Sequence, residues 1–145
     1  MLIVLFLSGP NLNMLGSRQP EIYGFATLNE HIQRVTGLAA LKGLTLEHQQ
    51  SNVEGVLVEA VQQARKRVAA IVVNAGALTH YSWALHDALA AFEGVKIELH
   101  ISNTHSRESW RHQSVIAPVV QGSIQGFGGF GYDLAIEAVA RLLAA

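Results

Sequence analysis

The sequence predicts an α/β fold in which a parallel sheet of five strands is covered by helices on both faces. Apolar runs of strand length recur along the chain, and each is followed by a loop and a segment with helical spacing. Strands that are buried on both faces of a parallel sheet have nearly continuous apolar sequences, as these runs do. No repeat, linker or low-complexity tract interrupts the alternation, so we expect residues 1–145 to form a single domain.

Five segments have the length and composition of strands. They are Leu2–Leu7, Thr45–Gln50, Ala69–Asn74, Lys96–Ser102 and, more weakly, Gly122–Gln125. Crossovers between parallel strands are right-handed, and helices must cover both faces of the sheet. We therefore expect the strand order 2-1-3-4-5, which is the three-layer arrangement called flavodoxin-like.

Two patterns with capping-box spacing mark the starts of helices, at Thr27 to Glu30 and at Ser51 to Glu54. In a capping box, the side chains supply acceptors for backbone N–H groups that the first helical turn leaves unpaired. The four expected helices run from these boxes to about Lys42 and Arg67, and over Ser82–Phe92 and Gly131–Leu143.

The fourth strand has an unusual distribution of polar residues. Apolar and polar residues alternate along it, with Ile97, Leu99 and Ile101 on one face and Glu98, His100 and Ser102 on the other. Removing an acid and an imidazole from water is costly, so this face indicates part of an active site. Glu98 is close enough to hold the imidazole of His100 oriented and protonated. The alternative is a polar edge strand that faces water.

The overall composition narrows the classes of function. The formal net charge is −1 and the ten Lys and Arg residues are scattered, which is not typical of proteins that bind nucleic acids or anionic membranes. Half of the residues are hydrophobic and only 14% are charged, so we expect a homo-oligomer that covers part of the surface. The chain has no cysteine, and its first apolar run is too short for a signal peptide. We expect a cytoplasmic protein.

Three polar loops are expected to meet at one edge of the sheet, because the carboxyl ends of parallel strands lie there. They are Ser8–Gly24, Asn74–His80 and Asn103–His112. Loops as long as the first are usually lids or binding segments. Ligands bind at this edge in open α/β sheets, so we expect the functional site there.

A tyrosine and three arginines lie in these loops, namely Tyr23, Arg18, Arg107 and Arg111. A phenol is almost fully protonated at neutral pH, and a positive charge close to it stabilises the phenolate. Two arginines beside Tyr23 could therefore make it a general base. The alternative is that Tyr23 packs at a turn and the arginines are solvated.

Other polar residues in these regions have two possible roles. Asn11 and Asn13 either brace a turn or contact a ligand, and Asn74 at the end of an apolar strand has either a structural or a functional partner. His80 either contacts a ligand or merely precedes a helix. Asp87 lies within a helix, where an acid more often faces solvent or another subunit. The histidines lack metal-ligand spacing, so we expect no metal.

The segment from Gly126 to Gly131 matches the G-x-G-x-x-G pattern of dinucleotide-binding loops. Too little chain follows it to form the later strand that brings an acid to the ribose of such a cofactor. We interpret the segment as a glycine-rich turn that packs its two phenylalanines.

Taken together, several segments resemble the type II 3-dehydroquinate dehydratases almost from end to end. The motifs that carry the resemblance are GPNLNMLG, Arg18, Tyr23-Gly24, QSNVEG, NAGALTH, ELHISN, RESWRH and GFGGFGYDLA. The resemblance implies a flavodoxin-like fold, no cofactor, and anti elimination of water from 3-dehydroquinate to give 3-dehydroshikimate. This reaction serves either aromatic biosynthesis or quinate catabolism. The resemblance also implies a dodecamer built as a tetramer of trimers.

The resemblance further implies roles for particular residues. Tyr23 would remove the proton next to the ketone, with Arg18 and Arg107 holding it as phenolate. Asn11 would position a water that stabilises the enolate.

In the same family pattern, His100 would protonate the departing hydroxyl and Glu98 would orient it. The residues that would hold the substrate are Asn74, His80, Arg111, the backbone of Ile101 and Ser102, and Asp87 from a neighbouring subunit.

Three positions depart from the usual family pattern. Ala75 stands where proline is common, Gln19 where glutamate is common, and Trp110 where phenylalanine is usual. None removes a chemical group from the mechanism. Ala75 and Gln19 bear on the rigidity of the loop that holds Asn74 and on the mobility of the segment from Arg18 to Tyr23, which we expect to close as a lid.

The alternative function is a non-catalytic flavodoxin-like module that binds FMN or a phosphorylated partner. The sequence lacks the acidic cluster and the phosphate-binding loop that are expected of such modules.

Overall fold

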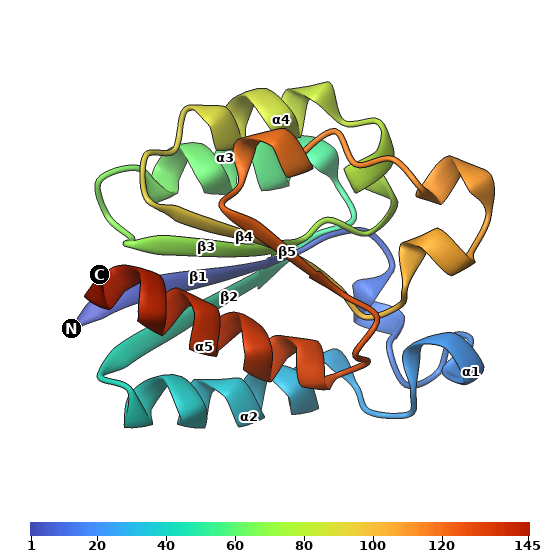
Figure 1. Ribbon diagram of the computed structural model, residues 1–145, viewed down its shortest axis with the longest axis horizontal. Coiled ribbons are helices and arrows are strands. Elements are labelled where there is room, and N and C mark those ends of the chain that lie inside the picture. Colours follow the sequence, from blue (N-terminus) through green and yellow to red (C-terminus); the bar gives the residue numbers. More distant parts are fainter.

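The computed structural model describes residues 1–145 as a sheet of five parallel strands between two layers of helices (Figure 1). The strands are β1 (Leu2–Ser8), β2 (Leu44–Gln50), β3 (Ala70–Asn74), β4 (Val95–His100) and β5 (Gly122–Gln125). Every neighbouring pair is parallel, and the order is β2-β1-β3-β4-β5. The predicted fold class and strand order are confirmed.

Helices cover both faces of this sheet. They are α1 (Pro20–Tyr23), α2 (Leu28–Leu41), α3 (Glu54–Ala64), α4 (Trp83–Ala90) and α5 (Phe130–Ala144). α2 and α5 lie against one face, and α3 and α4 lie against the other (Figure 1). The single-turn helix α1 stands apart from these layers, beyond the carboxyl ends of the strands (Figure 1). To span a bilayer, a helix would need more length and apolar content than any of these has.

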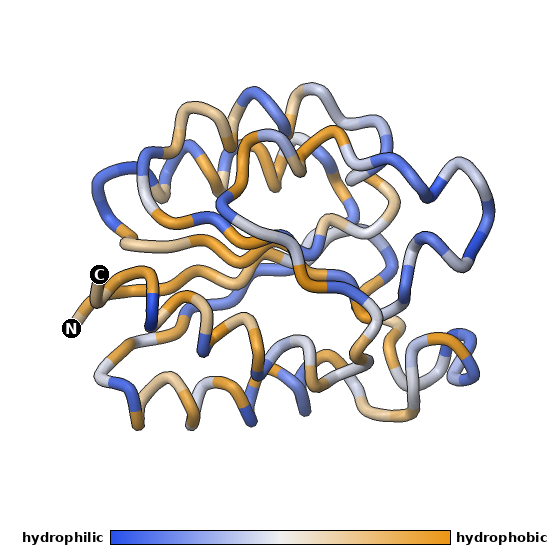
Figure 2. Tube along the Cα trace, in the orientation of Figure 1, coloured by the Kyte–Doolittle hydropathy of each residue, from blue (hydrophilic) through white to orange (hydrophobic).

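Two hydrophobic cores, one on each face of the sheet, hold the layers together. Successive residues of β1 point to opposite faces, so Val4 and Phe6 lie in the core under α2 and α5, whereas Leu5 and Leu7 lie in the core under α3 and α4. Hydrophobic residues are concentrated along the central strands (Figure 2). Close packing on both faces makes the sheet a rigid frame for the residues at its strand ends.

The start of α2 is a capping box, as predicted. The Thr27 hydroxyl accepts a hydrogen bond from the backbone N–H of Glu30, and the Glu30 carboxylate accepts one from the backbone N–H of Thr27. Both donor–acceptor distances are 3.1 Å. Two N–H groups that the helix leaves unpaired are therefore satisfied locally.

The second predicted capping box, from Ser51 to Glu54, is wrong. α3 begins at Glu54 itself, so this side chain lies too early in the helix to complete a box. The Ser51 hydroxyl accepts a hydrogen bond from the backbone N–H of Val53, and the Glu54 carboxylate accepts one from the Ser82 hydroxyl before α4. The acidic residue thus joins the starts of two neighbouring helices.

Other element ends differ from the prediction by a few residues. α3 ends at Ala64 rather than near Arg67, since Lys66 has a left-handed backbone with a φ of 63°. β4 ends at His100, so the predicted last residue, Ser102, belongs to the loop that follows. The short helix α1 lies inside a segment that the sequence predicted only as a loop.

The glycine-rich segment 126–131 forms a turn, but the prediction that it packs two phenylalanines is wrong. The side chains of Phe127 and Phe130 are 60% and 59% exposed. Gly131, rather than an aromatic residue, lies against β4, where a Cβ would be 2.9 Å from the side chain of Leu99. This close approach of helix and strand favours glycine and leaves both aromatic rings outside the core.

The two predicted boxes should respond differently to the loss of a hydroxyl group. The substitution Thr27→Ala should lower the free energy of unfolding by about 1 kcal/mol, because an N–H group at the start of α2 loses its acceptor. Ser51→Ala should change it by less than about 0.5 kcal/mol, because Ser51 does not cap α3. Urea unfolding at one protein concentration measures both values, and equal losses would contradict this assignment.

Candidate active site

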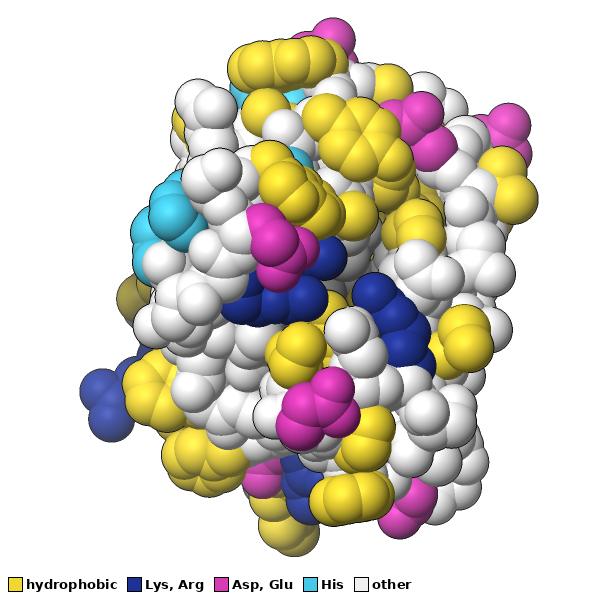
Figure 3. Space-filling view, turned by 90° about the vertical axis from the view of Figure 1, so that its right-hand side faces the viewer, with side chains coloured by type: hydrophobic (Ala, Val, Ile, Leu, Met, Phe, Trp, Pro, Cys, Tyr) yellow, Lys and Arg dark blue, Asp and Glu magenta, His cyan; other side chains and the backbone are white.

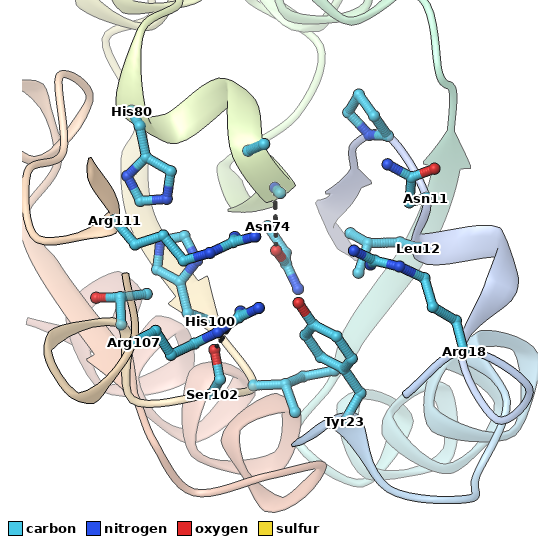
Figure 4. A pocket seen from close by; sticks show the side chains of 15 residues that line it. Asn11, Leu12, Arg18, Tyr23, Asn74, His80, His100, Ser102, Arg107 and Arg111 are labelled. Atoms are coloured by element: carbon cyan, nitrogen blue, oxygen red, sulfur yellow. Dashed lines mark hydrogen bonds between the residues drawn. The ribbon is translucent and has the colours of Figure 1, made fainter. Parts of the chain in front are cut away.

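A cavity opens at the carboxyl ends of β1, β3 and β4. Its lining side chains come from all three predicted loops and from the end of the fourth predicted strand (Figure 4). They include Asn11, Leu12, Arg18, Tyr23, Asn74, His80, His100, Ser102, Arg107 and Arg111. In the space-filling view of this end of the molecule, basic patches flank a central hollow (Figure 3). The positive surroundings suit a ligand that carries a carboxylate or another anionic group.

The structure brings most of the predicted site residues together. Apart from Glu98 and Asp87, every one of them lines the cavity, Ile101 included. Glu98 lies directly behind His100. Asp87 lies on α4 outside the cavity, where its carboxylate is 3.0 Å from the ring nitrogen of His86. A role for Asp87 in such a site therefore needs a second copy of the chain.

Tyr23 is the last residue of α1, and two arginines lie beside its ring. The guanidinium carbons of Arg18 and Arg107 are each 5.2 Å from the ring centroid. Pro20 begins this turn of helix and Gly24, with a φ of 83°, ends it, so the turn presents the phenol to the cavity. The alternative is therefore half right: Tyr23 packs at a turn against the core, but Arg18 and Arg107 lie over its ring.

The segment that carries Arg18 and Tyr23 is closed at its base. Gly16 has a φ of 93°, and a Cβ on it would be 2.8 Å from the carbonyl oxygen of Phe25. The backbones on either side of residues 17–24 therefore touch, and the segment is a small loop with adjacent ends.

Glu98 and His100 form a buried pair on β4. This strand pairs with both β3 and β5, so the alternative of a polar edge strand that faces water is wrong. Glu98 is 2% exposed and His100 is 8% exposed. The Glu98 carboxylate lies 2.7 Å from Nε2 of His100 and accepts its hydrogen bond. The pair has the geometry that the alternating sequence predicts.

Two serines that the sequence analysis did not single out also donate hydrogen bonds to Glu98. Ser114 Oγ is 2.9 Å from Oε2, and Ser123 Oγ is 3.2 Å from Oε1. Ser123 is the register partner of Glu98 on β5, so the predicted pairing of the fourth and fifth strands could have located it. Ser114 lies in a loop without any periodic signal.

The charge state of Glu98 is set by two opposing effects. Burial raises the pKa of this carboxyl, because it disfavours the charged form. Hydrogen bonds from His100, Ser114 and Ser123 and the charge of His100 favour the charged form, and together they hold the pKa below its usual value. The site therefore contains a buried carboxylate anion beside an imidazole.

Of the three candidate asparagines, Asn74 is buried and hydrogen-bonded, whereas Asn11 and Asn13 are exposed. Asn74 is buried at the end of β3, where its side-chain oxygen accepts a hydrogen bond from the N–H of Gly76 at 3.3 Å and its Nδ2 lies 3.5 Å from the hydroxyl of Tyr132. Burial raises the pKa of Tyr132 to about 12, so that phenol stays neutral. Asn11 lines the cavity (Figure 4), whereas Asn13 accepts a hydrogen bond from a β2 side chain.

His80 presents a neutral ring to the cavity. Burial lowers its pKa, and the charges of His100 and Arg111 lower it further, against the opposing effect of a hydrogen bond to the carbonyl of Gln113. That bond joins Nδ1 to the carbonyl oxygen over 2.7 Å, so Nδ1 is the donor and Nε2 is free to accept. The ring centroid is 6.4 Å from that of His100. His80 can therefore accept a hydrogen bond from a ligand hydroxyl.

Comparisons with known proteins agree along nearly the whole chain. Residues 2–140 match the family model described as Dehydroquinase class II. The chain is 49% identical over 138 residues to 3-dehydroquinate dehydratase 2 of Pseudomonas aeruginosa, which covers 95% of this chain and 93% of that protein. It is 48% identical over 137 residues to the catabolic 3-dehydroquinase of Aspergillus clavatus, which covers 94% and 91%.

Solved structures show the same similarity. The type II dehydroquinase from Butyrivibrio crossotus superposes with a TM-score of 0.93 and is 41% identical, over 95% of this chain and 97% of that one.

The low pKa of Glu98 predicts how stability depends on pH. Because the folded pKa lies below the ordinary value of 4.5, the carboxylate contributes stability that is complete above that pH and is lost as the pH falls through the folded pKa. Glu98→Gln should lower the free energy of unfolding by about 3 kcal/mol near neutral pH, because three hydrogen-bond donors around it lose a charged acceptor.

The difference between the wild type and Glu98→Gln should shrink as the pH falls below 4.5. Glu59→Gln, on the exposed side of α3, is the matched control and should change the free energy of unfolding little at either pH. Urea unfolding at fixed protein concentration measures each value. A Glu98→Gln effect of the same size at both pH values would contradict the low folded pKa.

Proposed function

Because the chain belongs to the class II dehydroquinase family, we propose that it is a hydro-lyase that converts 3-dehydroquinate to 3-dehydroshikimate by anti elimination of water. The names of its relatives support this substrate. The observation that carries the proposal is one cavity lined both by a tyrosine beside two arginines and by a histidine held by a glutamate. Elimination of water needs one group to take a proton from carbon and another to give one to the leaving hydroxyl.

Tyr23 is proposed as the base. The guanidinium groups of Arg18 and Arg107 lie on its ring, and two positive charges at this distance stabilise a phenolate relative to a phenol. The phenolate would remove the proton next to the ketone and leave an enolate. Asn11 would hold a water that donates a hydrogen bond to the enolate oxygen, where a preorganised donor contributes about 3 kcal/mol.

His100 is proposed as the acid. Its Nε2 is held by the Glu98 carboxylate, which stabilises the imidazolium form. The imidazolium would give a proton to the departing hydroxyl, so that the hydroxyl leaves as water. Base and acid are then separate groups, which suits an anti elimination in which the proton and the hydroxyl leave adjacent carbons on opposite faces of the ring.

The remaining lining residues are proposed to hold the substrate. Arg111 supplies positive charge for the carboxylate, and the neutral His80 and the fixed amide of Asn74 suit hydroxyl groups. The backbone of Ile101 and Ser102, just after β4, would supply further hydrogen bonds. These contacts would orient the reacting carbon between base and acid.

We also propose a homo-oligomer, as a dodecamer of four trimers, in which Asp87 reaches the substrate of a neighbouring subunit. Large apolar side chains support this arrangement, because Tyr81 and Trp83, close to Asp87 in the chain, are 61% and 63% exposed. The segment from Arg18 to Tyr23 is proposed to close over the bound substrate and exclude water.

A non-catalytic flavodoxin-like module is the competing interpretation. Binding alone would not need a base and an acid around the same small cavity, so the geometry favours catalysis. A cofactor-free absorbance assay for the conjugated enone product separates the two interpretations directly.

Removal of the tyrosine hydroxyl should abolish most of the activity. Tyr23→Phe should lower kcat about 10³-fold, because the base is lost while the ring still packs between the arginines. The enone assay measures the rate, and circular dichroism checks the fold. Ser106→Ala, which removes an exposed hydroxyl bonded to a nearby backbone carbonyl, is the control and should keep wild-type turnover. Near-normal turnover by Tyr23→Phe would refute the assignment of the base.

Removal of the acid should uncouple the two halves of the reaction. His100→Ala should form product about 10²-fold more slowly, because the hydroxyl leaves without a proton donor, yet Tyr23 should still exchange the proton next to the ketone. Mass spectrometry of the substrate recovered from D₂O measures that exchange. His48→Ala on β2, which lies outside the cavity and is bonded to Ser8, is the control and should behave as wild type. Equal loss of exchange and dehydration in His100→Ala would argue against separate base and acid.

A further inference from the structure

The carboxylate of Glu98 accepts hydrogen bonds from two serines as well as from His100. A second, polar cavity of about 180 Å³ lies beyond the pair and is lined by Glu98, Ser114 and Ser123 among others. The two serine hydroxyls reach different oxygens of the carboxylate, at 2.9 Å and 3.2 Å. The proposed mechanism so far gives neither serine a part.

Ser114 has its hydroxyl proton directed by the backbone. Its Oγ accepts a hydrogen bond from the N–H of Ala117 at 3.0 Å, at the beginning of the short 3₁₀ turn Ala117–Val119. A hydroxyl has a single proton, and an ionised carboxylate can only accept. With the Ala117 N–H on its lone pair, Ser114 therefore donates its proton to Glu98.

This direction determines which ring nitrogen of His100 carries a proton toward Glu98. Ser114 and His100 contact the same oxygen, Oε2 of Glu98. An ionised carboxylate oxygen only accepts, so the ring must present Nε2–H to it. The hydrogen bond from Ser114 favours this ionised form of Glu98. Nδ1 is then the ring nitrogen available to a ligand.

Ser123 is a weaker second holder of the same carboxylate. It comes from β5, is the register partner of Glu98, and its contact with Oε1 is the longer of the two. Ser123 is exposed, whereas Ser114 is partly buried. Water can therefore replace the Ser123 hydroxyl more readily than that of Ser114.

We propose that Ser114 is a positioning residue for the acid half of the reaction, because it fixes the Glu98 carboxylate so that His100 keeps Nε2–H toward Glu98 and Nδ1 toward the substrate. The proposal rests on the dehydration proposed above. Ser114, a loop residue outside the substrate cavity, would then control the orientation of the proton donor His100.

The expected effect of Ser114→Ala is on turnover rather than on substrate binding. kcat should fall about ten-fold, because a buried charge loses one of its donors, while KM should change less than about two-fold. Ser114→Thr keeps the hydroxyl and should restore turnover. Ser106→Ala, which removes a hydroxyl bonded only to a nearby backbone carbonyl, is the matched control and should match the wild type.

The pH profile gives a readout that a merely structural role would not move. Ser114 helps to hold the pKa of Glu98 down, so its loss should let Glu98 take up a proton at higher pH, and the acid limb of the kcat profile should move to higher pH. The titratable and charged groups that face the pair are His80, Arg107, Arg111, His105, His112 and Tyr23. All are kept in Ser114→Ala, so a shifted limb reports on Glu98 and His100.

A measurement on the free protein separates this proposal from the proposed function. Nitrogen-15 NMR of labelled histidines, with His100 assigned by His100→Ala, should show Nε2–H in the wild type. In Ser114→Ala, where the carboxylate has lost a donor, part of the population should have lost the Nε2 proton to Glu98 and keep only the other tautomer. An inactive wild type with this tautomer change would overturn the dehydratase function and leave the positioning role standing. Unchanged tautomer, kcat and pH profile in Ser114→Ala would overturn the positioning role.

Discussion

A carboxylate buried inside a parallel sheet is the constraint on which the rest of this structure depends. Glu98 is 2% exposed on a strand covered on both sides, and a charge in such a place is tolerated only when donors replace the lost water. The donors come from three parts of the chain: β4 itself, the loop before β5, and β5. Pairing of β5 with β4 therefore supplies one of the donors that stabilise the charge at the site.

The proposed acid and base sit on supports of different stiffness. His100 is the last residue of a strand within a close-packed sheet, whereas Tyr23 ends a single turn of helix in a long loop. A rigid acid suits a role that depends on one fixed hydrogen bond. A base on a loop lets substrate enter before the reacting groups surround it. The fold thus places the proposed acid on a rigid strand and the proposed base on a loop at the same edge of the sheet.

Sequence patterns predicted the elements that depend on local or periodic signals. The strand order, the capping box at Thr27 and the pair on β4 follow from such signals, and the structure confirms them. The errors lie where tertiary contacts override local pattern: Glu54 bonds to the neighbouring helix instead of its own cap, and Gly131 takes the packed position expected of a phenylalanine. No local pattern marks Ser114, because it meets Glu98 through a contact between residues sixteen positions apart.

The contact between Gly16 and Phe25 has a consequence for how the proposed base would be switched on. A loop pinned at its base moves as a unit, so Arg18 would travel with Tyr23, while Arg107 would stay behind, bonded to Ser102. If the loop swung outward, Tyr23 would therefore keep Arg18 beside its ring and lose Arg107. Under the proposed mechanism, both arginines would flank the phenol only when the loop is closed, so a reactive phenolate would form only after water has been excluded.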